Sequence, residues 1–178
     1  MPYGSPTSRN PPSAAYCAES LANSAAVSPQ PDITVAAIVV RDGRFLVVEE
    51  RIGGRDVLNQ PAGHLERGET LLQAVVRETL EETAWTLAPR SLLGAYLWQP
   101  PRASRPTMRF AFVGEVSGHD PSRELDHPVL AAHWMSRAEL EAQAQRLRSP
   151  LVLRCIDDFL AGRCEPLASV ATLESASR

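Results

Sequence analysis

The stretch GHLERGETLLQAVVRETLEETA, residues 63–84, decides the fold of this chain. Thr70, followed three residues later by Gln73, makes a capping-box pattern that predicts the start of a helix. Apolar side chains then recur at helical spacing, which predicts that one face of this helix packs against a core. The residues of that face are Leu72, Val75, Val76 and Leu80.

Three glutamates of this helix gather beside its apolar face. At 100° per residue Glu78, Glu81 and Glu82 project together, and the helix is expected to end near Thr83. Acidic clusters are usually solvated surfaces. Here Glu78 and Glu82 form a like-charge pair one turn apart, close to the negative end of the helix dipole. Arg77 can neutralise only part of this charge, so the cluster favours a divalent cation, Mg²⁺ or Mn²⁺.

The rest of the chain is predicted to be one folded domain between two tails. With 178 residues, 44% of them hydrophobic, the chain can build one core. Residues 1–31 are rich in Pro, Ser and Ala and residues 167–178 in Ser and Ala, so we expect flexible tails on both sides of a domain over 32–166. Three cysteines without a CxxC pair predict neither a disulfide framework nor a zinc site: Cys17, Cys155 and Cys164.

Apolar runs predict a sheet that is covered on both faces. The runs ITVAAIVV (33–40) and FLVVEE (45–50) flank an Asp-Gly turn, which predicts a hairpin. They are nearly continuous, as in strands buried on both sides. The segment 57–69 is rich in turn residues, which predicts a loop. Further elements are expected as strands over 92–99, 108–116 and 130–135, a helix after the capping box of Ser136 and Glu139, and a last helix between Ser149-Pro150 and Gly162.

Charge and hydropathy exclude two kinds of partner. The net charge of −3 argues against a protein that grips a nucleic-acid polymer through bulk electrostatics. No run of about 18 apolar residues predicts a membrane span, and the N-terminus lacks the pattern of a secretory signal. We therefore expect a cytoplasmic protein without membrane or nucleic-acid partners. The sequence leaves a homodimer open.

The charged positions of the quoted stretch follow the pattern G-x5-E-x7-R-E-x-x-E-E, formed by Gly63, Glu69, Arg77, Glu78, Glu81 and Glu82. At every one of these positions the chain resembles the Nudix hydrolase family. Two other positions depart from the family pattern. Thr79 stands where an aliphatic residue is usual, and Ala84 replaces the glycine that follows the helix. Because that glycine usually adopts a positive φ, Ala84 either costs about 1 kcal/mol or the chain leaves the helix by another route.

This resemblance implies a fold, a reaction and a cofactor. The fold is α/β, an α/β/α sandwich with a mixed β-sheet and a loop-helix-loop catalytic motif. The reaction is hydrolysis of a phosphoanhydride bond in a small phosphorylated molecule, with Mg²⁺ or alternatively Mn²⁺ as the cofactor. Glu78 and Glu82 would coordinate the metal, Glu81 would be a further ligand, and the backbone carbonyl of Gly63 another. Glu78 is also the candidate general base.

Further site residues are implied outside the acidic face of the helix. Glu69 and Arg77 would form a salt bridge that braces the preceding loop against the helix. In this family a later loop often supplies one more acidic ligand. Asp126 is our candidate for it, ahead of Glu124 and Asp120.

A longer resemblance, over about residues 33–170, indicates the phosphatase NudJ branch of the family. It rests on NQPAGHLE (59–66), FLVVEE (45–50) and RSPLV (148–152). Members of that branch remove phosphate from nucleoside di- and triphosphates and from hydroxymethylpyrimidine pyrophosphate, so we expect stepwise release of orthophosphate. Candidate substrate-binding residues are His64, Arg51, Arg109 and Trp98, the last together with Tyr96.

Two other functions compete with this interpretation. One is a pyrophosphatase for ADP-ribose or another nucleoside-diphosphate derivative, because the glutamate pattern reports metal and phosphate chemistry and not the leaving group. The other is a non-catalytic Nudix domain that senses a nucleotide and regulates a partner. Such domains usually lose carboxylates of the pattern, whereas this chain keeps all of them.

Overall fold

A hairpin of β1 (Asp32–Arg41) and β2 (Arg44–Ile52) opens the folded part of the chain, as the Asp-Gly turn predicts. Asp42 and Gly43 have φ values of 49° and 72°, and two successive positive φ angles match the twist of a two-residue hairpin. The structure is a computed structural model that describes residues 30–101 and 105–173.

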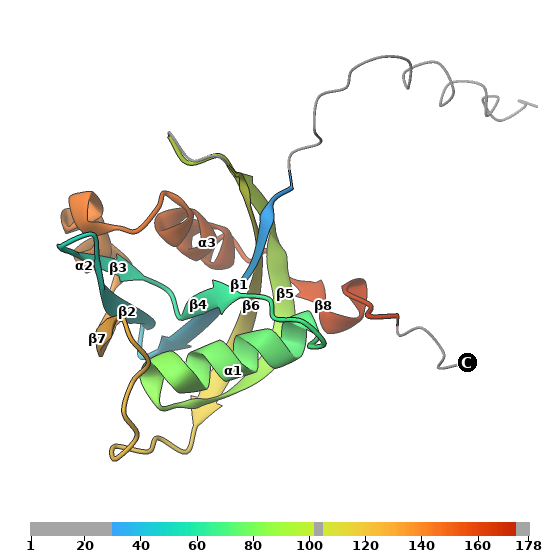
Figure 1. Ribbon diagram of the computed structural model, residues 1–178, viewed down its shortest axis with the longest axis horizontal. Coiled ribbons are helices and arrows are strands. Elements are labelled where there is room, and N and C mark those ends of the chain that lie inside the picture. The colour runs from blue at the N-terminus through green and yellow to red at the C-terminus, as the bar shows by residue number, and fades with distance from the viewer. Residues whose placement is uncertain (1–29, 102–104, 174–178) are drawn as a thin grey trace, which may run out of the picture.

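The strands form a mixed sheet (Figure 1). Neighbouring strands run in the order β3 (Arg55–Asn59), β2, β1, β6 (Thr107–Ser117), β5 (Thr86–Trp98) and β8 (Glu165–Pro166), with β4 (Ala62–His64) beside β1 and β7 (Val129–Met135) beside β2. The β1–β6 pair is parallel, and the other pairs between these strands are antiparallel. The predicted mixed sheet is confirmed.

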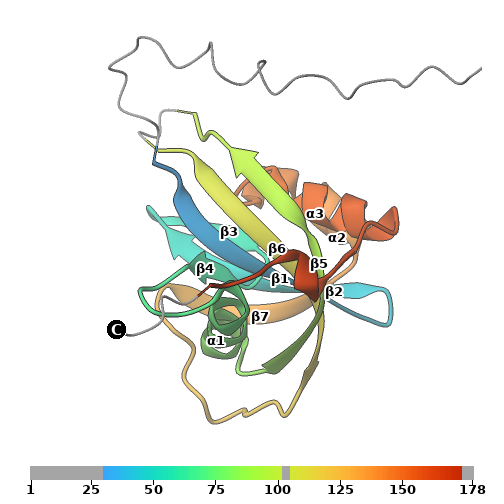
Figure 2. The same cartoon turned by 90° about the vertical axis from the view of Figure 1, so that its right-hand side faces the viewer.

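Helices cover both faces of the sheet. In Figures 1 and 2, α1 (Leu71–Thr83) lies on one side, whereas α2 (Arg137–Ala142) and α3 (Leu151–Leu160) lie on the other. Alternate residues of β1 pack on the two sides of the sheet, because successive strand side chains point to opposite faces. Val35, Ala37 and Val39 belong to the core under α1, and Ile38 belongs to the core that contains Ile156 of α3. The described ranges also contain two short 3₁₀ turns, η2 (Ala144–Arg146) and η3 (Leu167–Ser169).

Helix α1 begins and ends where the sequence predicts. Thr70 and Gln73 form the complete capping box. At the other end Ala84 takes the left-handed conformation, with φ 56° and ψ 16°, and its N–H donates to the carbonyl of Leu80 at 2.9 Å. The chain therefore leaves the helix by the route that usually needs glycine, and Ala84 bears the cost of about 1 kcal/mol. Thr79 is fully buried, and its hydroxyl donates to the carbonyl of Val75 at 2.7 Å.

Three strands differ from the prediction. Part of the segment predicted as a loop contains β3 and β4, two short strands separated by Gln60 and Pro61. Their five and three residues are too few to show a period, and their pairing with β2 and β1 determines their conformation. β5 starts at Thr86, six residues earlier than expected, and continues past Pro89 because the register shifts there.

The ends of the domain also differ in part. Residues 1–29 of the expected N-terminal tail lie outside the described residues, and β1 begins at Asp32 as expected. After residue 166 the chain does not leave the domain at once: Leu167 and Val170 pack against the core under α1. The tail expected over 167–178 therefore starts too early, because residues up to Val170 pack against the domain. None of the helices within the described ranges is long and apolar enough to cross a membrane.

Candidate active site

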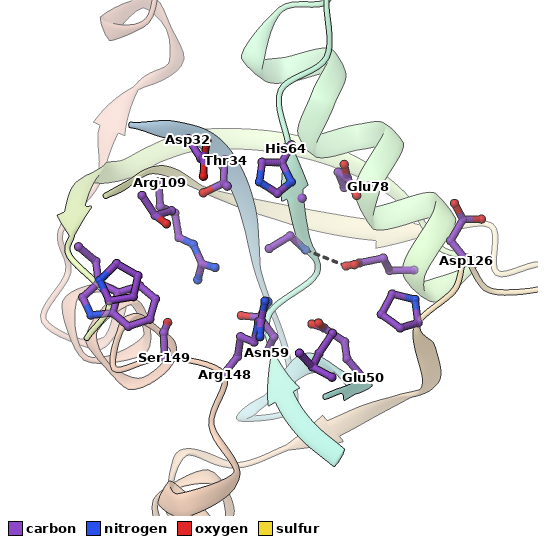
Figure 3. Close-up of a pocket in the computed structure, with 18 of the residues that line it drawn as sticks. Asp32, Thr34, Glu50, Asn59, His64, Glu78, Arg109, Asp126, Arg148 and Ser149 are labelled. Carbon is purple, nitrogen blue, oxygen red and sulfur yellow. Dashed lines mark hydrogen bonds between the residues drawn. The ribbon is translucent and has the colours of Figure 1, made fainter. Parts of the chain in front are cut away.

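A cavity of about 770 Å³ opens where α1 meets β1, β2, β4 and β6 (Figure 3). The acidic residues Glu50, Glu78 and Asp126 lie toward one side of it, and Arg109 reaches into it from the other. Glu82 also lines this cavity. One concave space therefore holds acidic and basic groups within reach of one ligand.

Glu82 is the most deeply placed carboxylate of α1. Its side chain is 8% exposed, and its Oε2 accepts a hydrogen bond of 2.8 Å from the backbone N–H of Ala62 in β4. Burial raises the pKa of Glu82 to about 9, and the neighbouring carboxylates of Glu50 and Glu78 add to the shift, while the Ala62 N–H opposes it. Ionising this group in the folded protein is therefore costly, and a bound cation would favour the ionised form.

Glu78 lies directly over Gly63. A Cβ atom on Gly63 would stand 2.1 Å from Glu78 Cδ and Oε1. Glycine at position 63 therefore leaves room for this carboxylate where it lies. The φ angle of Gly63 is not the reason, because it is not in the left-handed region. Burial raises the pKa of Glu78, while an ion pair of 2.7 Å between its Oε1 and Arg77 Nη1 opposes the shift. Strand β4 and helix α1 thus jointly determine where the Glu78 carboxylate lies.

We expect Gly63→Ala to lower kcat by roughly tenfold or more without unfolding the protein. The new methyl group has to displace the Glu78 carboxylate, whose flexible side chain can move, while the β4 backbone stays paired with β1. Steady-state kinetics and a thermal melt would measure both effects. Gly94→Ala is the matched control, because a Cβ there would approach Tyr96 Oη only to 3.2 Å. Equal kcat values for the two variants would contradict the prediction.

Arg77 organises the acidic face of the helix. Its Nη2 donates to Glu69 Oε1 at 2.7 Å and to the His64 carbonyl at 3.0 Å, and its Nη1 donates to Glu81 Oε2 at 3.0 Å. Glu69 Oε1 also accepts from the N–H of Glu66 at 2.7 Å. The expected Glu69–Arg77 salt bridge is thus present, and it ties the loop before α1 to the helix. Arg77 holds the pKa of Glu69 below its usual range.

Glu81 differs from its expected position. It does not line the cavity, and its carboxylate is turned toward Arg77. The helical wheel places Glu81 beside Glu78 and Glu82, but it does not show that an arginine four residues earlier takes this side chain away from the site. As placed, Glu81 supports Arg77, and its role as a further ligand stays a prediction.

Glu50 is a site residue that the sequence analysis did not identify. It is 7% exposed and lines the cavity, and its Oε1 has no hydrogen-bond partner in the structure. Burial raises its pKa, and a hydrogen bond from the Asn59 side chain opposes the shift. Strand alternation alone does not single it out, because both faces of β2 are buried: Phe45 and Val47 are as inaccessible as Leu46 and Val48.

The other predicted residues divide between cavity and surface. Asp126 lines the cavity, and its N–H donates to the Glu81 carbonyl at 3.0 Å, whereas Asp120 and Glu124 do not line the cavity. His64, Arg109 and Trp98 also line it. Arg51 does not: it pairs with Asp56 at 2.7 Å on the exposed side of β2. Strand alternation sends Arg51 away from the face of Glu50. Tyr96 donates its hydroxyl hydrogen to Asp158 at 3.0 Å.

The oxygen atoms of this site suit a hard divalent cation in their chemistry. Glu50, Glu78, Glu82 and Asp126 all line one cavity, and so does Gly63, on the strand that pairs with β1. Carboxylate and carbonyl oxygens are the preferred ligands of Mg²⁺. In the described ranges, however, no three acidic, histidine or cysteine side chains stand ready to hold a metal ion together. Glu78 is engaged by Arg77, so binding would require a small turn of the carboxylates.

Comparison with known proteins assigns the class. The family model of the NUDIX domain matches residues 30–155, and the chain belongs to the Nudix family. It is a hydrolase that acts on phosphoanhydride bonds. Within the family, the chain is 40% identical to the phosphatase NudJ of Escherichia coli K12 over 141 residues, which are 79% of this chain and 91% of that protein.

Solved structures agree with this assignment. A NUDIX hydrolase from Nitrosomonas europaea is 42% identical, with a TM-score of 0.79, over 81% of this chain and 98% of that one. A MutT NUDIX hydrolase from Burkholderia pseudomallei, 23% identical with a TM-score of 0.62 over 72% of this chain and 98% of that one, shares the fold. The predicted α/β Nudix fold is confirmed.

Proposed function

We propose that this Nudix hydrolase is a phosphatase that depends on a divalent metal ion and removes terminal phosphates stepwise from nucleoside tri- and diphosphates or from hydroxymethylpyrimidine pyrophosphate. The observation that carries the proposal is the set of carboxylates around one cavity, of which Glu50 and Glu82 are buried and Glu78 is partly buried. The similarity to phosphatase NudJ over most of both chains supports the phosphatase activity.

Mg²⁺ is the proposed cofactor, with Mn²⁺ as the alternative. Glu50, Glu78, Glu82 and Asp126 would hold it, with the carbonyl of Gly63. When bound, such an ion neutralises phosphate charge and makes a water molecule more acidic. Glu78 is our candidate for the group that accepts the proton of the attacking water. Its place in the cavity, directly over Gly63, supports this role.

Product analysis with a nucleoside triphosphate in ¹⁸O-labelled water tests the proposal. We expect orthophosphate as the first product, carrying the label, followed by conversion of the diphosphate to the monophosphate. Attack of water on the terminal phosphorus has this outcome, because the new bond forms to the phosphoryl group that leaves. Pyrophosphate as the first product, or ADP-ribose cleaved far faster than nucleotides, would replace the phosphatase with a pyrophosphatase. A protein that binds nucleotides without turnover would be a sensor.

We further propose that the catalytic residues all lie within residues 32–166, while Leu167 and Val170 add packing to the core under α1. The family model begins at residue 30, and β1 begins at Asp32. Removal of residues 1–31 is expected to leave kcat/KM within about twofold, because their composition cannot build a packed contact. The truncated and full-length proteins would be compared by kinetics and thermal melting. A large loss in either measurement would show that the N-terminal segment contributes to the folded enzyme.

A cytoplasmic location and the absence of nucleic-acid partners stay predictions of the sequence, which also leaves a homodimer open.

A further inference from the structure

Unpartnered polar atoms concentrate in the candidate active site. Within residues 30–101 and 105–173, four buried side-chain atoms have no hydrogen-bond partner: Thr34 Oγ1, Glu50 Oε1, Asn59 Oδ1 and Arg109 Nε. All four side chains line the same cavity (Figure 3). Leaving a buried polar atom unpaired costs about 1–3 kcal/mol, so four such atoms around one space indicate a ligand that pairs with them.

The four atoms divide by chemistry and by place in the fold. Glu50 Oε1 and Asn59 Oδ1 are acceptors on β2 and β3, and their side chains interact with each other. They suit the cation side of a ligand. Thr34 and Arg109 can donate hydrogen bonds, and they are register partners on the parallel strands β1 and β6. Paired residues of neighbouring strands point to the same face, so this second pair suits an anion.

Arg109 is held in place without a carboxylate in direct contact. Its side chain is 6% exposed, and its Nη1 donates a hydrogen bond of 3.3 Å to Gln60 Oε1. Gln60 is itself fixed by a 2.7 Å hydrogen bond from its Nε2 to the carbonyl of Val152 in α3. A buried guanidinium with a neutral partner is costly. Its Nε is buried without a hydrogen-bond partner, and the Nε and Nη groups of arginine form a fork that matches a phosphate.

A ligand bound beside Arg109 would lie between acidic and basic side chains. The carboxylates of Glu50 and Glu82 attract its guanidinium, and Arg148, which lines the same cavity, repels it. Figure 3 shows Arg109 extending from β6 toward Asn59 and Arg148, with Glu78 and Asp126 on the far side of the cavity. A phosphate between Arg109 and Arg148 would remove their repulsion and provide the missing counter-ion.

We propose that Thr34 and Arg109 form an anion subsite for the phosphate on the leaving side of the scissile bond, the one that stays with the organic part of the substrate. This inference rests on the proposed function, and it places the terminal phosphate on the carboxylate side of the cavity, where the proposed metal ion would be held. When water oxygen bonds to the terminal phosphorus, the bond to the bridging oxygen breaks and its electron pair stays on the leaving phosphate. Arg109 then faces the group on which negative charge increases.

Calorimetric titration of the full-length protein with Mg²⁺ present tests the subsite without requiring turnover. The probes are AMP, which carries a leaving-side phosphate, and orthophosphate, the product of the attacked side. Arg109→Gln is expected to weaken AMP binding by at least about tenfold, the effect of losing charge-assisted hydrogen bonds, and orthophosphate binding by less than about twofold. Arg109→Lys should restore part of the AMP affinity, because it keeps the charge and not the fork.

A control variant and a third probe distinguish this subsite from a general loss of positive charge at the cavity. Arg105→Gln removes an exposed arginine at the same cavity, paired with Asp32 at 3.4 Å, and should change AMP binding by less than about twofold. Adenosine, which has no phosphate, should bind wild type and Arg109→Gln alike. Equal weakening of AMP and orthophosphate, Arg109-dependent adenosine binding, or no AMP binding by the wild type would each overturn the subsite. Arg109-dependent AMP binding by a protein that does not cleave nucleotides would uphold the subsite and refute the proposed substrates.

Discussion

Excess EDTA is expected to abolish turnover by at least about 10³-fold, and added Mg²⁺ to restore it. The reason is the crowding of Glu50, Glu78 and Glu82, whose pKa values are all raised by burial. Without a cation these carboxylates are harder to ionise, and in their ionised form they repel both one another and an incoming phosphate. A metal ion reverses the sign of the local field, and its stabilisation of the transition state amounts to several kcal/mol.

The control for this experiment is EDTA that has been saturated with Mg²⁺ before it is added. It tests whether the chelator itself inhibits, and we expect full activity in its presence. A thermal melt in both solutions would show whether the protein remains folded without metal. Turnover that persists in free EDTA, with the metal content of the protein verified by elemental analysis, would contradict a metal-dependent mechanism.

Much of the catalytic helix could be predicted because its determinants are local. The capping box of Thr70 and Gln73, the apolar stripe and the arginine pair all involve residues within about two turns of one another. The same holds for the Asp42-Gly43 turn, whose conformation depends on two residues. Patterns of this kind need no knowledge of the rest of the chain.

The acidic site was predicted only in part, because its members come from several elements. Glu50 belongs to β2, and which of two adjacent residues faces the cavity depends on the register of that strand. The choice of Arg51 as a substrate residue was one residue away from the side chain that does line the cavity. Glu81 was placed correctly on the helix, but its pairing with Arg77 is a contact that the helical wheel does not describe.

Short strands and buried polar contacts could not be predicted from the sequence either, because they too depend on residues from several elements. β4 is three residues long, and it is a strand because β1 pairs with it. The sequence indicates Arg109 only as a candidate substrate-binding residue, whereas the structure shows a buried guanidinium that lines the cavity beside Thr34. That environment arises from residues 75 positions apart in the chain, and single-sequence patterns do not report such distances.

Glu82→Gln is expected to lower kcat by at least about 10²-fold, or about 2.7 kcal/mol in the barrier, while the protein stays folded. The glutamine oxygen can still accept the hydrogen bond from the Ala62 N–H, so the anchor to β4 remains and the charge is lost. Glu81→Gln, one residue earlier and outside the cavity lining, is the matched comparison and should lose less than about tenfold. Equal losses in the two variants would show that the cavity position is not what matters.

The same variant predicts a change in stability with a defined sign. Burial raises the pKa of Glu82 from 4.5 to about 9, so between these values the folded, metal-free protein binds a proton that the unfolded chain releases. The stability of the wild type is therefore complete below pH 4.5 and falls as pH rises toward 9. Glu82→Gln lacks this loss, and in EDTA its Tm should match the wild type near pH 5 and exceed it at pH 8. A lower Tm for Glu82→Gln at pH 8 would identify Glu82 as a structural residue.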